Sequence, residues 1–138
     1  MNSQAMELFM AYLSSNEINP DVIDEERGII RVGFRLKNTS VSLFMYFEDE
    51  DKYAHIEGRN FVNIPSNQID KIFKICNDLN DSYRWVKFVW DPNANDVCCR
   101  CDAVVQLDSC AEEMYELMAR MSTIIDEAYP EIMKGLWG

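Results

Sequence analysis

Apolar residues near the N-terminus recur at the spacing of one helix face. Within residues 3–16 they follow the i, i+3, i+4, i+7 pattern of an amphipathic helix. The positions are Ala5, Leu8, Phe9, Tyr12 and Leu13. Pro20 follows, and proline cannot continue a helix because it lacks an N–H donor. The pattern predicts one helix over residues 3–16.

Three later stretches alternate between apolar and polar residues, as half-buried strands do. They span residues 30–36, 41–47 and 53–64. Asn38, Thr39 and Ser40 provide turn residues between the first two, and an acidic turn at residues 48–51 precedes the third. We therefore expect these strands to form a meander.

A second helix is predicted to begin at Pro65 and Ser66, because proline is tolerated in a first turn and serine accepts hydrogen bonds from free amides. The helix is predicted to end near Asn80, and its apolar face is formed by Ile69, Ile72, Phe73, Cys76 and Leu79. Two further strands, at residues 85–90 and 97–105, flank a polar turn. The pattern predicts a hairpin after the second helix.

A third helix is predicted after Ser109, which has the spacing of a capping box with Glu112. Beyond Pro130 we expect a short tail that docks on the body of the protein through Ile132, Met133, Leu136 and Trp137. The methionines of the third helix allow two interpretations, ordinary core or an adaptable groove for a partner, because thioether side chains repack readily.

The expected order is helix, three strands, helix, two strands, helix, which is an α+β arrangement. We expect a largely antiparallel five-stranded sheet with the helices packed on one face. The chain has 138 residues and contains no linker or repeat, so we expect a single domain over residues 1–138.

Strand alternation also predicts which residues lie on the sheet face opposite the helices. Aromatic residues and five of the thirteen cations fall there: Phe44, Tyr46 and Trp85 with Arg31, Arg35, Arg59, Lys87 and Arg100. Because aromatic residues and arginine are enriched at interfaces, this face is a candidate site for a partner with acidic and apolar groups. The alternative is that cross-strand ion pairs with Glu48, Glu57 and Asp102 simply solvate the sheet.

The net charge of −11 repels phosphate backbones, so nucleic acid is not an expected partner. No apolar run approaches membrane-spanning length, and residues 1–13 lack the cationic region of a signal peptide. The cysteines are odd in number, and three are crowded at residues 98–101, which favours reduced thiols over a disulfide framework. We therefore expect a cytoplasmic protein that does not bind membranes.

Candidate catalytic and metal-binding residues are few. His55 is the only histidine, and its position in the middle of a predicted strand favours a surface residue. Cys98, Cys99 and Cys101 suggest zinc, but alternation directs Cys98 outward and the other two inward, which favours core packing. We expect no enzyme activity and no cofactor.

The turn after Asp91 resembles the opening of a calcium loop. Its first, third, fifth and twelfth positions are Asp91, Asn93, Asn95 and Asp102. Asp96 replaces the glycine that such a loop needs, and strands flank the turn instead of helices. We therefore expect a solvated hairpin turn.

Residues 76–105 resemble the YbjN-type domain family, whose members are described as bacterial sensory-transduction regulators. The family pattern is an Asn-x-x-Asn helix end, a strand, an acidic turn and a second strand. Here it reads Asn77, Asn80, then residues 85–88, 91–96 and 97–105. Residues 128–132 also resemble the close of that family. Capping and bonding to the following turn would equally explain Asn77 and Asn80.

The resemblance implies a fold similar to class I type III secretion chaperones, which are usually homodimeric and bind an extended segment of another protein. It supplies no catalytic residues. The leading hypothesis is therefore a non-enzymatic homodimeric module, chaperone-like or regulatory, that binds a protein segment on the sheet face or along an edge strand. The competing hypothesis is a small-ligand-binding or metal-binding protein that uses Cys98, Cys101 and His55 or the Asp91 turn.

Overall fold

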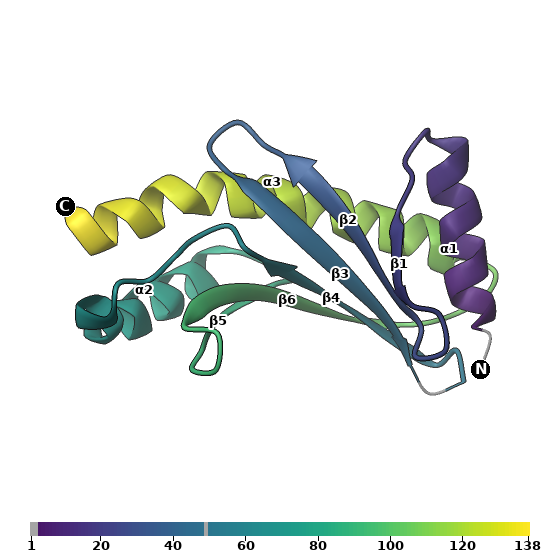
Figure 1. The fold of residues 1–138 in the computed structure, drawn as a ribbon, viewed down its shortest axis with the longest axis horizontal. Coiled ribbons are helices and arrows are strands. Elements are labelled where there is room, and N and C mark those ends of the chain that lie inside the picture. Colours follow the sequence, from purple (N-terminus) through teal and green to yellow (C-terminus); the bar gives the residue numbers. More distant parts are fainter. Residues whose placement is uncertain (1–2, 49) are drawn as a thin grey trace.

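A computed structural model describes residues 3–48 and 50–138, and its architecture is a single antiparallel sheet with helices on one side (Figure 1). The sheet has six strands in the order β1-β2-β3-β4-β6-β5. In chain order the elements are α1 (Gln4–Ser15), β1 (Asp21–Asp24), β2 (Ile29–Arg35), β3 (Ser40–Glu48), β4 (Tyr53–Arg59), the 3-10 turn η1 (Ser66–Gln68), α2 (Ile69–Ser82), β5 (Lys87–Asp91), β6 (Asp96–Val104) and α3 (Cys110–Trp137).

The prediction of five strands is wrong, because β1 adds a sixth at the edge of the sheet. It pairs with β2 through Asp21 opposite Arg31 and Val22 opposite Ile30, and the register shifts before Asp24. Four residues are too few for alternation to be visible in the sequence. The predicted meander of the next three strands is confirmed by the order β2-β3-β4.

The predicted tail beyond Pro130 is also wrong, because α3 continues without interruption to Trp137. Proline lacks the N–H that would bond to the carbonyl four residues earlier, which belongs to Asp126. Asn38, in the turn between β2 and β3, supplies a replacement. Its side-chain amide donates to the Asp126 carbonyl at 3.0 Å, and its backbone N–H donates to the Asp126 carboxylate at 2.6 Å.

Several boundaries differ from those expected. The strand expected from residue 85 begins only at Lys87, because Trp85 has a φ of 74°, outside the extended region. Helix α2 runs past Asn80 to Ser82. At the start of α3 the Ser109 hydroxyl donates to the Glu113 carboxylate at 3.2 Å, so the expected capping box does not form.

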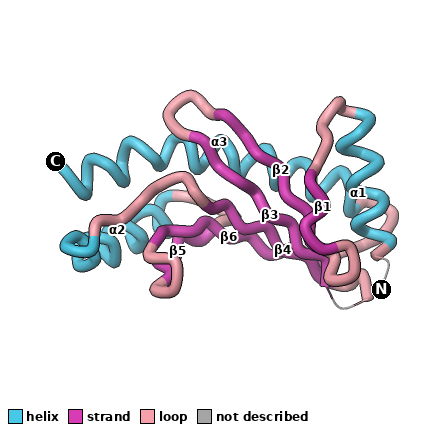
Figure 2. The backbone as a smooth tube through the Cα atoms, in the orientation of Figure 1, coloured by secondary structure: helices cyan, strands magenta, loops and turns pink. Residues whose placement is uncertain are grey.

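The core lies between the sheet and the three helices, all of which pack on one sheet face (Figures 1 and 2). The inward positions predicted by alternation are buried in β2, β3, β4 and β6, except Phe34 and Ala103, which are half-buried against the core. Met114, Met118 and Met121 of α3 are also buried, so they belong to the core.

The N-terminus of helix α1 is hydrogen-bonded to the turn between β3 and β4. Ser3 is its N-cap, and the Ser3 hydroxyl donates to the Asp51 carboxylate at 2.6 Å. The Asp51 carboxylate also accepts from the backbone N–H groups of Gln4 and Ala5, at 3.2 and 3.1 Å. The turn between β3 and β4 therefore satisfies N–H groups that a helix start leaves without an intrahelical partner.

Candidate partner-binding surfaces

The sheet face opposite the helices, which we call the open face, carries seven of the eight residues proposed from the sequence. Register aligns Arg31, Phe44, Glu57, Arg100 and Lys87 in one row across five strands. Tyr46 and Arg59 lie on the same face two residues away from this row along their strands, and Arg35 lies four residues away. Trp85 does not lie there, because it precedes β5 and its side chain contacts α3.

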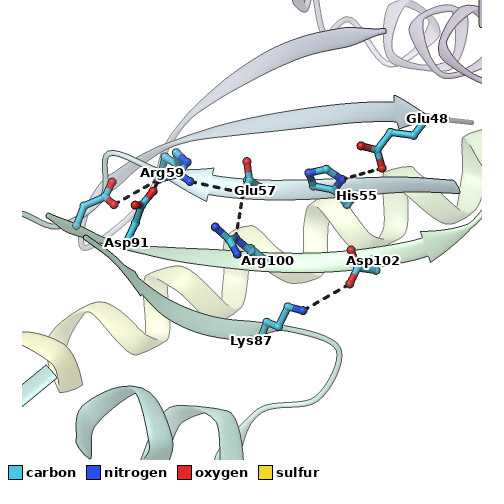
Figure 3. Close-up of polar contacts among 9 residues, drawn as sticks. Glu48, His55, Glu57, Arg59, Lys87, Asp91, Arg100 and Asp102 are labelled. Carbon is cyan, nitrogen blue, oxygen red and sulfur yellow. Dashed lines mark hydrogen bonds and ion pairs between the residues drawn. The ribbon is translucent and has the colours of Figure 1, made fainter. Parts of the chain in front are cut away.

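Arg59 is the centre of an ion-pair network on the open face (Figure 3). Its guanidinium lies 3.5 Å from Glu57, 3.1 Å from Asp91 and 3.3 Å from Asp96. The four side chains are only 12–20% exposed. Burial raises the pKa of Asp96 despite the opposing effect of Arg59, whereas the backbone N–H of Asn93 and then Arg59 lower the pKa of Asp91.

Three other cations of this face are also paired. Arg100 Nε lies 3.0 Å from the Glu57 carboxylate without hydrogen-bond alignment, and Lys87 lies 3.7 Å from Asp102. Arg31 contacts Asp21 at 2.8 Å. Within the described residues, Arg35 is exposed and has no ion pair. Glu57 and Asp102 are thus cross-strand partners as the alternative interpretation expected, while Glu48 pairs with His55 (Figure 3).

The aromatic residues of the open face are half-buried. Tyr46 stacks on His55 with ring centroids 4.4 Å apart and an interplanar angle of 10°. Burial raises the pKa of Tyr46, and the negative charge of Glu57 adds to this effect. His55 Nδ1 lies 3.3 Å from the Glu48 carboxylate. These contacts make the histidine part of a packed surface layer.

Of the three cysteines in β6 that were expected to pack in the core, Cys99 and Cys101 do so, whereas Cys98 is buried on the other face of the sheet. Cys98 shares the open face with Arg100 yet is fully buried, whereas Cys99 and Cys101 face the helices. All five cysteines are free and buried. Burial raises the pKa of each thiol, that of Cys76 to about 11, which keeps the thiols protonated.

The proposed metal ligands are not brought together. Cys98 and Cys101 lie on opposite faces of β6. In the Asp91 turn, the carboxylate of Asp91 is engaged by Asn93 N–H and Arg59, and the Asn95 amide bonds to Trp90 and Ile64. Across residues 3–48 and 50–138, no group of three or more His, Cys, Asp or Glu side chains is placed to hold a metal ion.

The two family-motif asparagines differ in role. Asn77 is exposed on α2. The side chain of Asn80 accepts from the Phe88 N–H at 2.6 Å and donates to the Phe88 carbonyl at 3.2 Å. Asn80 therefore pairs with the outer edge of β5 as a neighbouring strand would, and it protects that edge of the sheet.

A second candidate surface lies where β6 extends beyond β5. Strand β5 pairs only with residues 96–100 of β6, so residues 101–104 have β4 on one side and no strand on the other within the described chain. A groove of about 440 Å³ occupies this position. We call it the edge groove, and its lining includes Trp85, Asp102, Val104, Val105, Met114 and Leu117.

Main-chain groups of β6 are directed into the open side of the edge groove. The N–H of Val105 donates to the Lys52 carbonyl on the β4 side at 2.8 Å. Because alternate residues of an antiparallel strand direct both main-chain groups to the same neighbour, the N–H and C=O of Asp102 and Val104 are directed away from β4. The Asp102 carbonyl accepts only a weak bond from the Cys101 thiol, at 3.8 Å, so these groups can pair with an added strand.

Two exposed apolar side chains border the edge groove. Trp85 is 60% exposed and Val104 is 71% exposed. The guanidinium of Arg120, on α3, lies 6.0 Å from the centroid of the Trp85 ring. Sequence reasoning identified Trp85 but placed it on the wrong surface, and it missed Glu113, Glu116, Leu117 and Arg120, which line the groove from α3.

Comparisons with known proteins give a family match and a solved structure of similar fold. Residues 6–133 match the family model YbjN, described as "Putative bacterial sensory transduction regulator". The crystal structure of YbjN from E. coli, described as "a putative transcription regulator", is similar with a TM-score of 0.65 and 10% sequence identity, over 91% of this chain and 92% of that chain. No protein with a curated description matches the sequence. Within the described residues, no helix has the length and apolar character needed to cross a membrane.

Proposed function

The chain belongs to the YbjN family, and we propose that it is a non-enzymatic regulatory module that acts by binding a segment of another protein. The description of the family as a regulator supports this role. The protonated, buried thiols and the packed His55 offer no activated nucleophile, which also favours binding over catalysis.

The observation that carries the proposal is the edge groove. Proteins normally protect strand edges, because unpaired N–H and C=O groups pair readily with other chains. Here β5 is protected by Asn80, but the edge at Asp102 and Val104 remains open beside an exposed tryptophan. Tryptophan is among the residues that contribute most at protein interfaces.

The open face stays a second proposed surface, formed by Phe44, Tyr46 and the five cations. Its ion pairs weaken the case, because a partner would have to compete with carboxylates already in place. Arg35 is the cation with the most freedom to pair with an incoming acidic group. Phe44→Glu tests this surface directly, since a carboxylate there would repel an acidic partner.

Affinity purification from a native lysate, followed by mass spectrometry, tests the proposed function. Trp85→Ala should abolish capture of a partner. Trp137→Ala is a matched control, because Trp137 is also 60% exposed but lies at the end of α3. Loss of capture with Phe44→Glu alone would move the site to the open face, and failure of the unmodified chain to retain any protein would refute the proposed function.

We also propose that the protein is a homodimer in the cytoplasm. The five free cysteines support a reducing compartment. Light scattering at micromolar concentration measures the mass in solution, for comparison with 16.1 kDa for one chain. A strict monomer mass would refute the dimer.

A further inference from the structure

We propose that the edge groove takes an extended segment of a partner protein as an additional strand of the sheet, and that this segment alternates apolar with basic side chains. The inference rests on the proposed function and specifies the chemistry of the partner.

The geometry leaves a strand position empty beside β6. If β5 continued backward from Lys87 in the same register, residue 86 would lie opposite Cys101 and residue 85 opposite Asp102. The chain turns away instead, because Trp85 has a φ of 74°. A bulky side chain rarely adopts this conformation, and strained backbone of this kind is concentrated at binding sites.

The position requires an extended segment because of the spacing of the free main-chain groups. Asp102 and Val104 are two residues apart, so their outward N–H and C=O groups match alternate residues of an antiparallel or parallel strand. Side chains on one side of that strand would enter the groove between Trp85 and Leu117. Those positions favour apolar residues, in the manner of peptides that add a strand to a sheet edge.

The charged residues at the rim of the groove indicate which side chains the remaining positions of the bound segment should carry. The rim carries three carboxylates, on Asp102, Glu113 and Glu116, and one cation, Arg120. Arg120 is already paired with Glu116 at 2.8 Å, and Asp102 lies 3.7 Å from Lys87, so Glu113 is the rim carboxylate without an ion pair among the described residues. Lysine or arginine on the segment would therefore meet an excess of negative charge, reinforced by the chain's net charge of −11.

The same charge argues against a second copy of this chain as the occupant. Two edge grooves brought together would place acidic rim against acidic rim, and each chain carries the full net charge. Like charges opposed across an interface disfavour association. A dimer would therefore use another surface.

The test uses the full nitrogen-15-labelled chain and three synthetic peptides of equal length. One alternates valine with lysine, one alternates valine with glutamate, and one has the same composition as the first with its lysines and valines in separate blocks. In NMR titrations we expect the Val-Lys peptide to shift the amide signals of Asp102 and Val104 and the indole signal of Trp85. The other two peptides should bind at least about tenfold more weakly.

Val104→Pro is the sharpest variant, because proline removes an N–H directed to the open edge and leaves the β4 side intact. Val104→Thr is its matched control, since threonine is β-branched and keeps the N–H. We expect Val104→Pro to weaken binding of the Val-Lys peptide at least about tenfold and Val104→Thr to bind within about twofold of the unmodified chain. Unchanged amide signals in β2 and β3 verify the fold of the proline variant.

Equal binding of the Val-Lys and Val-Glu peptides would overturn the charge assignment. Equal binding by the two Val104 variants would overturn strand addition, as would peptide-induced shifts confined to Phe44 and Tyr46. Each of these results leaves partner capture from a lysate unaffected. Absence of capture by the unmodified chain would instead refute the proposed function.

Discussion

At the residue scale, Trp85 combines a left-handed backbone with an exposed ring, two features that stability alone would not select. Its φ of 74° suits glycine, which has no Cβ, and is unfavourable for any other residue except asparagine and aspartate. The exposed ring is consistent with selection for binding. Substitutions that remove the ring but differ in their preference for the left-handed backbone separate the two features.

We predict that Trp85→Gly is more stable than Trp85→Ala by about 1 kcal/mol, because both remove the ring but only glycine accepts the left-handed backbone without strain. Urea unfolding at equilibrium, followed by circular dichroism, measures the difference. Both variants should fail to capture the partner. Equal stability of the two would show that residue 85 relaxes to an ordinary conformation once the ring is gone.

Asp51 gives a prediction for pH dependence. Burial acts to raise its pKa, but hydrogen bonds from Ser3, Ala5 and Gln4 outweigh burial, and the pKa lies below the ordinary value of 3.8. A lowered pKa in the folded state means that Asp51 contributes stability above pH 3.8 and loses it as pH falls further.

We therefore expect the unmodified chain to exceed Asp51→Asn in free energy of unfolding by a constant amount near neutral pH. Below pH 3.8 this difference should shrink progressively as the carboxylate becomes protonated. Urea unfolding at a series of pH values measures it. A difference that persists unchanged to low pH would contradict the role of the charge in holding the start of α1.

At the element scale, α3 depends on a contact that lies 88 residues away in the sequence. The Asn38 side chain donates to the Asp126 carbonyl, which Pro130 cannot reach with an N–H. We predict that Asn38→Ala lowers the free energy of unfolding by about 1 kcal/mol, because a carbonyl loses its donor. In a Pro130→Ala background the loss should be smaller, since the helix then supplies its own N–H.

A double-mutant cycle on Asn38 and Pro130 measures this coupling. The two free-energy changes should be non-additive, as expected for residues that act on one carbonyl. Strict additivity would mean that Asn38 stabilises the helix only through its bond to the Asp126 carboxylate.

The same elements explain which parts of the fold could be predicted from the sequence alone. Long periodic stretches predicted α1, the β2-β3-β4 meander and seven of the eight open-face residues, because side chains alternate strictly along a strand. Local signals at Pro130 and Ser109 failed, since partners distant in the sequence or a different local pairing decided the outcome. The edge groove was not predictable from the sequence. It depends on the strand order, in which β6 lies between β4 and β5, and on the backbone turn at Trp85.

At the scale of the whole molecule, negative charge is distributed unevenly. The open face carries five cations and six carboxylates, the latter being Asp21, Glu48, Glu57, Asp91, Asp96 and Asp102. It is therefore close to neutral in a chain of net charge −11, and most of the excess lies on the helices and turns. Glu113 and Glu116, the two rim carboxylates of the edge groove that come from α3, are part of that excess.

This distribution predicts opposite effects of salt on stability and on binding. Screening should reduce the repulsion among excess carboxylates more than it weakens the paired charges, because exposed ion pairs contribute little. Added sodium chloride should therefore raise the unfolding temperature by about a few degrees, while it weakens binding of a basic segment at the edge groove. Scanning calorimetry and peptide titration over the same salt series measure the two. A fall in unfolding temperature would mean that the Arg59 network dominates the electrostatics of the fold, and salt-independent binding would mean that the groove selects its partner by apolar contacts alone.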